Sequence, residues 1–283
     1  MIYYLLLIGA AALFSVQFFF QEKFQKRVGS SSKSAAIFSI GTGLGMALVS
    51  LPFVGSGLKI TLFSAVVAAC HGLASFLYMY FSLKALSTAN LSVLSIFTML
   101  GGMLLPVFYG VGLAGETMTV GKAFCCAAVT VSVMLTAGGK RGDKKAILYY
   151  LAVFVSNGAT SVCAAVHQNY PTMAVDSYSY MVLSSLALMA FGLLFLPFTL
   201  KNSETAGFKA ALDMAGFSVC SGLGNIVIMI SLLKLPASLQ FPFSTGAAVV
   251  FAAVITLIQG KKPRILDLVS VAVALISTVL IMF

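Results

Sequence analysis

The sequence has very few charged residues. Asp, Glu, Lys and Arg make up 8% of the 283 residues, while 60% are apolar and the mean hydropathy is +1.05. A soluble domain carries about 25% charged and roughly 45–50% apolar residues, and no globular interior of this size could bury the excess. The composition therefore excludes a soluble enzyme, a disordered chain and a secreted disulfide scaffold.

Cysteine and histidine are scarce and dispersed. The five cysteines all lie inside apolar runs, and their odd number argues against a disulfide framework. The two histidines, His71 and His167, lie in separate runs, so no Cys/His cluster has the spacing of metal ligands. A membrane-embedded enzyme would need an acid, base, nucleophile or metal cluster at one depth. We therefore expect no enzyme activity, no metal and no cofactor.

What the sequence does have is long apolar runs. A bilayer core of about 30 Å takes roughly 20 apolar residues per helix, and ten such runs use almost the whole chain. Because the runs are continuously apolar, we expect helices and not barrel strands. The predicted fold is an all-α integral membrane protein with ten transmembrane helices. They are expected at Ile2–Phe20, Ser34–Phe53, Thr61–Leu83, Ala89–Leu113, Thr119–Ala137, Ala146–Val166, Ala174–Phe198, Ala211–Leu233, Ala237–Ile258 and Ile265–Phe283.

The basic residues alternate between connections. The connections after the odd-numbered runs hold 14 of the 17 Lys and Arg residues. Basic residues prefer the cytoplasmic side of a membrane, so the charge distribution predicts that both termini lie outside.

The two halves of the sequence resemble each other. Five short matches recur in the same order at offsets of 145 to 150 residues, for example Leu51-Pro52-Phe53 with Leu196-Pro197-Phe198 and Cys70-His71-Gly72 with Cys220-Ser221-Gly222. We therefore predict two five-helix repeats, 1–140 and 141–283, within one membrane domain. Since five is odd, the second repeat enters the membrane from the opposite side. Inverted repeats are typical of secondary transporters, whose substrate site lies near the midplane between them.

Three segments carry a family resemblance. They are SLKALSTANLSVLSIF (82–97), LLPVFYGVGLAGE (104–116) and LLKLPASLQFPFSTG (232–246), and they resemble the EamA-type branch of the drug/metabolite transporter superfamily. The resemblance implies a ten-helix carrier whose central cavity is lined mainly by helices one, three, four, six, eight and nine. It also implies cytoplasmic termini, against the charge distribution. The family's Gly-Glu pair matches Gly115-Glu116, whereas the second half has Gly260-Lys261.

Uncharged polar residues occupy the middle of three predicted helices. They form the i, i+4 pairs His71/Ser75, Asn157/Ser161 and Ser221/Asn225, and this spacing places both members on one helix face. We predict that the three faces converge on a substrate-binding cavity. The alternative is that these groups hydrogen-bond across helices and hold the bundle together. Imidazole changes charge near neutral pH, so His71 could relay protons, contact substrate or be a satisfied core histidine.

Other polar residues are weaker candidates. Gln17, Tyr78, Asn90 and Gln240 are further predicted lining residues, and Phe14 and Phe18 could pack against an aromatic substrate. His167, at the end of a helix, is expected to lie at a solvated mouth. Glu116 and Lys122 are expected to be interfacial charges, with a gate as the alternative.

These observations predict a secondary transporter in a cytoplasmic membrane, most simply a bacterial one. The expected partners are membrane lipids and a small-molecule substrate that is neutral or zwitterionic, with proton coupling through His71 as an open option; nucleic acid is not an expected partner. The alternative functions are a lipid or isoprenoid-conjugate flippase and a channel-like facilitator with the same fold.

Overall fold

The described residues are almost entirely helical. The computed structural model describes residues 2–55, 57–88, 91–137, 144–199 and 205–258, with four helical positions between 269 and 276. Within them lie nine α-helices and two short 3-10 helices. Their bounds are α1 (Ile2–Val28), α2 (Ser32–Ser50), η1 (Leu51–Phe53), α3 (Leu62–Thr88), α4 (Leu91–Gly112), α5 (Val120–Ala137), α6 (Lys144–Asn169), α7 (Ser177–Phe195), η2 (Leu196–Thr199), α8 (Phe208–Leu232) and α9 (Ala237–Ile258).

Six of these helices are long and apolar enough to cross a membrane. They are α1, α2, α3, α6, α7 and α8, and the chain is accordingly a multi-pass integral membrane protein. This confirms the all-α membrane fold class that the sequence predicts. The predicted tenth span, 265–283, lies outside the described residues except for a few helical positions.

The first helix is longer than predicted. The sequence places its end at Phe20, where polar residues begin, but α1 continues to Val28. One face of the extension is buried, where Gln21 donates to Ser82 Oγ at 2.7 Å. The other face is partly exposed, and there Glu22 pairs with Lys26 at 2.7 Å. The helix ends at Gly29, whose φ of 97° is readily adopted only by glycine.

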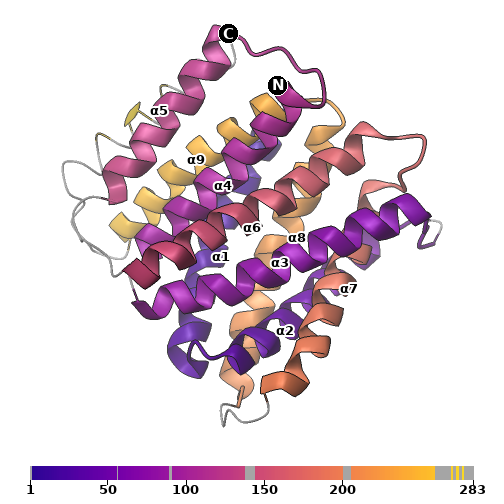
Figure 1. Ribbon diagram of the computed structural model, residues 1–283, viewed down its shortest axis with the longest axis vertical. Coiled ribbons are helices and arrows are strands. Elements are labelled where there is room, and N and C mark those ends of the chain that lie inside the picture. Colours follow the sequence, from indigo (N-terminus) through magenta and orange to yellow (C-terminus); the bar gives the residue numbers. More distant parts are fainter. Residues whose placement is uncertain are drawn as a thin grey trace.

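Helices from the two halves of the chain interlock. In Figure 1, α2 and α7 lie on one side of the bundle, and α5 lies on the opposite side near α9 and α4. Between these sides, α8 packs against both α1 and α2, and α3 packs against both α6 and α7. The pair α1 and α2 therefore contacts a helix of the second half, and the pair α6 and α7 contacts a helix of the first half.

Small residues allow the closest approaches between helices. Gly41 and Gly45 form a GxxxG pair on α2, and side chains there would collide with Met214 and Ser218 of α8. The two glycines thus allow α2 and α8 to pack closely. A side chain at Gly101 of α4 would collide with the backbone of Phe154 on α6. The backbones of α4 and α6 are thus in direct contact.

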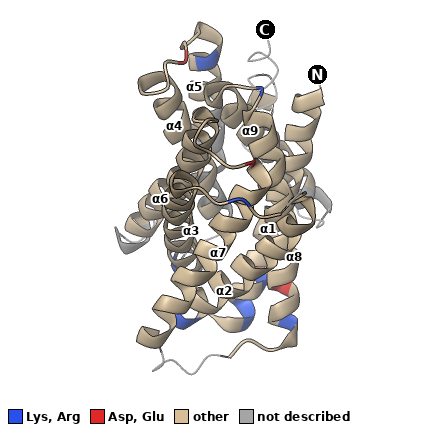
Figure 2. Ribbon diagram, turned by 90° about the vertical axis from the view of Figure 1, so that its right-hand side faces the viewer, with Lys and Arg blue, Asp and Glu red and all other residues tan. Residues whose placement is uncertain are grey.

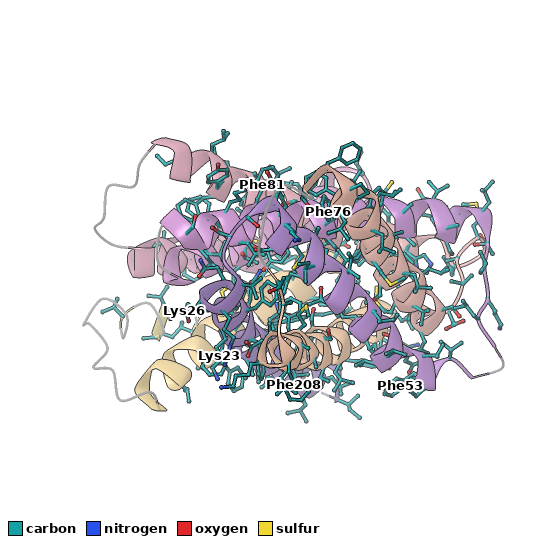
Figure 3. All side chains as sticks on the ribbon, turned by 90° about the horizontal axis from the view of Figure 1, so that it is seen from below. Lys23, Lys26, Phe53, Phe76, Phe81 and Phe208 are labelled. Carbon is teal, nitrogen blue, oxygen red and sulfur yellow. The ribbon has the colours of Figure 1, made fainter. Side chains whose placement is uncertain are left out.

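Charged residues lie near the ends of helices and in the connections between them (Figure 2). Lys23 and Lys26 lie at one end and Phe53 at the other (Figure 3). We call the end where α1 ends and α8 begins the Arg27 end, because Arg27 Nε pairs there with Asp213 Oδ2 at 2.7 Å. The opposite end, where α3 begins and α6 ends, is called the His167 end.

Candidate functional site

The three predicted polar pairs come together around one central cavity. His71 and Ser75 of α3, Asn157 and Ser161 of α6, and Ser221 and Asn225 of α8 all line a cavity of about 150 Å³. A cavity of this volume holds a small ring such as benzene. All six residues lie in the inner parts of their helices, well away from the helix ends.

The rest of the wall comes from the neighbouring helices. Gln17 and Tyr78, both predicted lining residues, line the cavity together with Phe14 and Phe18. Helices α1, α3, α4, α6, α8 and α9 supply nearly the whole wall, as the family resemblance implies, and α2 and α7 add only Met46 and Leu188. The role of these side chains in binding stays a prediction.

Several lining residues have no counterpart in the sequence prediction. They are Thr98 and Gly102 of α4, Thr160 of α6, and Ser244 and Thr245 of α9. Thr160 follows Asn157 by three positions, a spacing that also shares a helix face and could have pointed to it. Pro106 lies inside α4 and lacks the N–H that would otherwise bond to the carbonyl of Gly102.

The cavity wall combines polar groups with aromatic and thioether side chains and carries no formal charge. None of the described residues that line it is Asp, Glu, Lys or Arg. Its apolar surface comes mainly from aromatic and methionine side chains, namely Phe14, Phe18, Phe217, Phe241, Met46, Met79 and Met99. An isolated ionic group would be poorly solvated there, so the wall suits a molecule without net charge.

The two asparagines are held in place through their amide nitrogens. Asn157 Nδ2 donates to the carbonyl of Thr98 on α4 at 2.7 Å, and Asn225 Nδ2 donates to the carbonyl and hydroxyl oxygens of Ser221 at 2.9 and 3.2 Å. Among the described residues their carbonyl oxygens have no partner. Each asparagine is therefore oriented by the protein and keeps an acceptor for a bound molecule.

Toward the Arg27 end, Tyr78 of the cavity wall takes part in a hydrogen-bonded contact between α1 and α3. Tyr78, which is 5% exposed, donates its hydroxyl hydrogen to Gln21 Oε1 at 3.5 Å, and Gln21 Nε2 donates to Ser82 Oγ at 2.7 Å. Gln21 has no exposed surface. Gln21 was not predicted, because this part of α1 has the polar composition of a connection.

Toward the His167 end, His71 of the cavity wall is linked to Tyr180 and His167. His71 Nδ1 lies 3.1 Å from the Tyr180 hydroxyl, and the Tyr180 ring stacks on His167 with 3.9 Å between ring centroids. His167 Nε2 lies 3.0 Å from Ser64 Oγ. The expectation of a solvated mouth at His167 is wrong, because His167 has no exposed surface; α6 continues beyond the predicted end, and α3 and α7 cover the ring.

One predicted lining residue, Gln240, is not on the cavity wall. Gln240 is fully buried, and its Nε2 donates to the carbonyl of Ile228 at 2.9 Å, so it holds α9 to α8. Phe241, Ser244, Thr245 and Ala248 form the cavity face of α9, and Gln240 lies beside this face. Asn90 and the Gly260-Lys261 pair lie outside the described residues.

Glu116 has a structural partner. Its Oε1 and Oε2 accept the backbone N–H groups of Ala237 and Ser238, each at 2.9 Å. The first N–H groups of a helix have no partner within it, and a carboxylate there is favoured by the helix dipole. Lys122 is buried and donates from Nζ to the carbonyl of Thr117 at 3.0 Å. Both charges thus serve to fix the ends of helices at the His167 end.

Comparison with known proteins shows the fold. No protein-family model matches the sequence, and no curated protein is found to be similar. Among solved structures 29 chains match. One of them, described as "Crystal structure of protein", aligns over 98% of this chain and 98% of its own with a TM-score of 0.75 and 17% sequence identity. At this identity the likeness concerns the fold alone.

Proposed function

We propose that the protein is a secondary transporter that moves a small organic metabolite or drug-like solute by alternating access. The observation that carries this proposal is the central cavity. It lies among the inner parts of membrane-spanning helices, it is lined by oriented hydrogen-bonding groups, and its wall comes from both halves of the chain. A site at this depth between two halves is where a secondary transporter binds its substrate.

We further propose that the complete bundle has ten helices in two inverted repeats, 1–140 and 141–283, as in the EamA-type branch of the drug/metabolite transporters. The packing pattern supports this arrangement. Exchanging each helix with the one five places along the chain turns the α1–α8 contact into the α6–α3 contact, and the α2–α8 contact into the α7–α3 contact. The α2–α7 contact maps onto itself, and α2 and α7 are both followed by a Leu-Pro-Phe 3-10 helix.

The cavity wall favours a neutral or zwitterionic substrate that contains an aromatic or otherwise flat apolar part. The uncharged wall disfavours ions with an unbalanced charge. The phenylalanine and methionine side chains offer contacts to a ring, while the carbonyl oxygens of Asn157 and Asn225 accept hydrogen bonds from a polar end. Energy for uphill transport would come from a gradient or from exchange.

The proposed mechanism uses one closure at each end of the cavity. Tyr78 and His71 lie on α3 seven positions apart, and both line the cavity. Tyr78 contacts Gln21 toward the Arg27 end, and His71 contacts Tyr180 toward the His167 end. Alternating access requires one of these contacts to open while the other stays closed, so that the substrate never meets a continuous pore.

A ligand screen followed by counterflow tests the proposal. Purified protein is screened by thermal stabilisation against a metabolite library, since a ligand that binds the folded state raises the unfolding temperature. The stabilising compound is then used, radiolabelled, in proteoliposomes preloaded with the unlabelled compound. We expect transient accumulation of label, which a carrier produces and a channel does not. Unsaturable flux without counterflow would favour a channel, and movement of labelled lipid between leaflets would favour a flippase; protein-free liposomes are the control.

A further inference from the structure

His167 is enclosed by three elements at its end of the bundle. The imidazole has no exposed surface. Its ring lies parallel to Tyr180 of α7, with 3.9 Å between centroids, and to Phe63 of α3, with 6.2 Å between centroids. Nε2 lies 3.0 Å from Ser64 Oγ. The ring is therefore fixed in orientation and separated from water.

The second ring nitrogen has no partner. Nδ1 of His167 is buried and finds no hydrogen-bond partner among the described residues. In a neutral imidazole one nitrogen is a donor and the other an acceptor, and a serine hydroxyl can meet Nε2 in either role. A protonated imidazole has two N–H donors. In this closed arrangement protonation would leave a charged N–H without an acceptor.

The groups around His167 do not supply that acceptor. The two carboxylate oxygens of Asp176, at the start of α7, already accept the N–H and the hydroxyl of Ser179 at 2.9 and 2.7 Å. The hydroxyl of Tyr180 is paired with His71. Other titratable or polar residues in this region include Cys70 on α3, Cys163 on α6, Tyr170, whose ring packs on Phe63, and Lys59, whose backbone N–H donates to Ser179 Oγ at 3.3 Å. Asn169 bonds to Tyr109, and Gln168 bonds to Ser177 and Met229.

The balance of these contacts sets which protonation state fits the closed end. The faces of Tyr180 and Phe63 favour a cation only weakly, whereas burial of a charge without a hydrogen-bonded partner is strongly unfavourable. A neutral His167 therefore fits the closed end, and a protonated His167 requires water or another acceptor to reach Nδ1. That access requires α3, α6 and α7 to separate around the ring.

We propose that protonation of His167 controls the packing of this end of the bundle. When the imidazole is neutral, α3, α6 and α7 stay packed around it; when the ring takes a proton from water, these helices separate. The same Ser64 Oγ accepts the backbone N–H of Val175 at 2.9 Å. Release of the ring would therefore also loosen the connection before α7. A use of this control in transport rests on the proposed function, but the control itself does not.

The experiment uses the fact that the chain has two histidines. The full-length protein, labelled with ¹⁵N and ¹³C in histidine only, is placed in lipid nanodiscs and followed by NMR. The titration runs from about pH 8, where an ordinary imidazole is neutral, down to the pH at which the helical circular dichroism is lost. His71→Asn leaves one signal and so assigns His167. In parallel, hydrogen exchange of the Val175 amide is measured and corrected for the intrinsic effect of pH.

We expect His167 to be neutral at the upper pH and to become protonated on acidification, with protection of the Val175 amide falling at least about tenfold in the same pH range. His167→Asn, which stays neutral, should abolish that fall, and His71→Asn should retain it. The proposal is overturned if His167 protonates while protection is unchanged, or if protection falls equally in His167→Asn. It is also overturned if His167 stays neutral until the helical circular dichroism is lost. No substrate is needed, so these outcomes are independent of the counterflow test.

Discussion

Glu116 and Ala237, 121 positions apart, are joined by a hydrogen bond of 2.9 Å from the backbone N–H of Ala237 to the carboxylate. The other carboxylate oxygen accepts the N–H of Ser238 at the same distance. One side chain in the α4–α5 connection thus fixes where α9 begins. Because α9 carries part of the cavity wall, the position of that wall depends on an acid outside the cavity.

Replacing Glu116 tests this link. Glu116→Gln keeps the shape but turns one acceptor into a donor that faces a backbone N–H, so we expect a loss of about 1–2 kcal/mol in the free energy of unfolding. Exchange of the Ala237 and Ser238 amides should accelerate as well. The matched control is Glu22→Gln, which removes a partly exposed i, i+4 pair with Lys26 and should change stability by less than about 0.5 kcal/mol. Equal losses in the free energy of unfolding for the two substitutions would contradict a capping role of Glu116 at the start of α9.

The asparagine carbonyl oxygens can be tested as ligand contacts. Asn157→Ala and Asn225→Ala should each weaken binding of the stabilising compound by roughly tenfold, which corresponds to about 1.4 kcal/mol, as measured by ligand-dependent thermal shift. Ser156→Ala is the control, because Ser156 neighbours Asn157 but bonds to the carbonyl of Ala152 on its own helix. If Ser156→Ala weakens binding as much as Asn157→Ala does, the asparagines act through the fold and not through contact.

The backbone contact between α4 and α6 should tolerate no side chain. Gly101→Ala would press a methyl group against the carbonyl of Phe154, and overpacking of this kind costs about 1–3 kcal/mol. Gly9→Ala on α1 is the control, since nothing lies within 4 Å of the added carbon and alanine favours a helix over glycine. Thermal unfolding in nanodiscs should show a lower midpoint for Gly101→Ala only. An unchanged midpoint would mean that the two helices are not in contact.

The cap of α7 should depend on pH. Burial acts to raise the pKa of Asp176, but hydrogen bonds from the N–H and hydroxyl of Ser179 outweigh it and hold the pKa below its usual value. A carboxyl whose folded-state pKa is lowered contributes stability above its unfolded pKa, and this contribution is lost as the pH falls through the folded one. Asp176→Ala should therefore destabilise the protein by about 1 kcal/mol at neutral pH and by much less in strong acid.

Ser31→Ala provides the uncharged comparison. Ser31 caps α2 by accepting the N–H of Ser34 at 3.1 Å, and a hydroxyl does not titrate in this range. Its removal should destabilise by the same amount at both pH values, as followed by chemical unfolding. A pH-independent effect of Asp176→Ala would show that the carboxylate form of Asp176 does not make the cap.

The sequence was most informative about membrane helices and about polar pairs within them. Apolar runs of about 20 residues leave few alternatives to a helix in lipid, and the i, i+4 spacing of Asn157 with Ser161 and of Ser221 with Asn225 was enough to place both pairs on the cavity wall. Helix ends were harder to predict. Gln21, Glu22 and Lys26 look like a polar connection in the sequence, but tertiary partners extend α1 through them.

Residues whose role depends on another element could not be found from the sequence. His167 looks like a surface residue because Gln168 and Asn169 follow it; only the packing of α3 and α7 makes it a buried one. Gln240 has the composition of a lining residue, yet the rotation of α9 turns it toward Ile228. Glu116 gains its partner from a helix that begins 121 positions later. Helix rotation and contacts between distant segments are set by tertiary packing, which local patterns do not encode.

The clasped arrangement of α8 between α1 and α2, and of α3 between α6 and α7, has a consequence for assembly. Neither half of the polypeptide can reach its final structure by itself. The first half lacks α8, which packs against α1 and α2, and the second half lacks α3, which packs against α6 and α7. The protein should consequently mature late, after α8 has left the ribosome. Fragments cut between residues 137 and 144 should be degraded when made singly and rescued when made together.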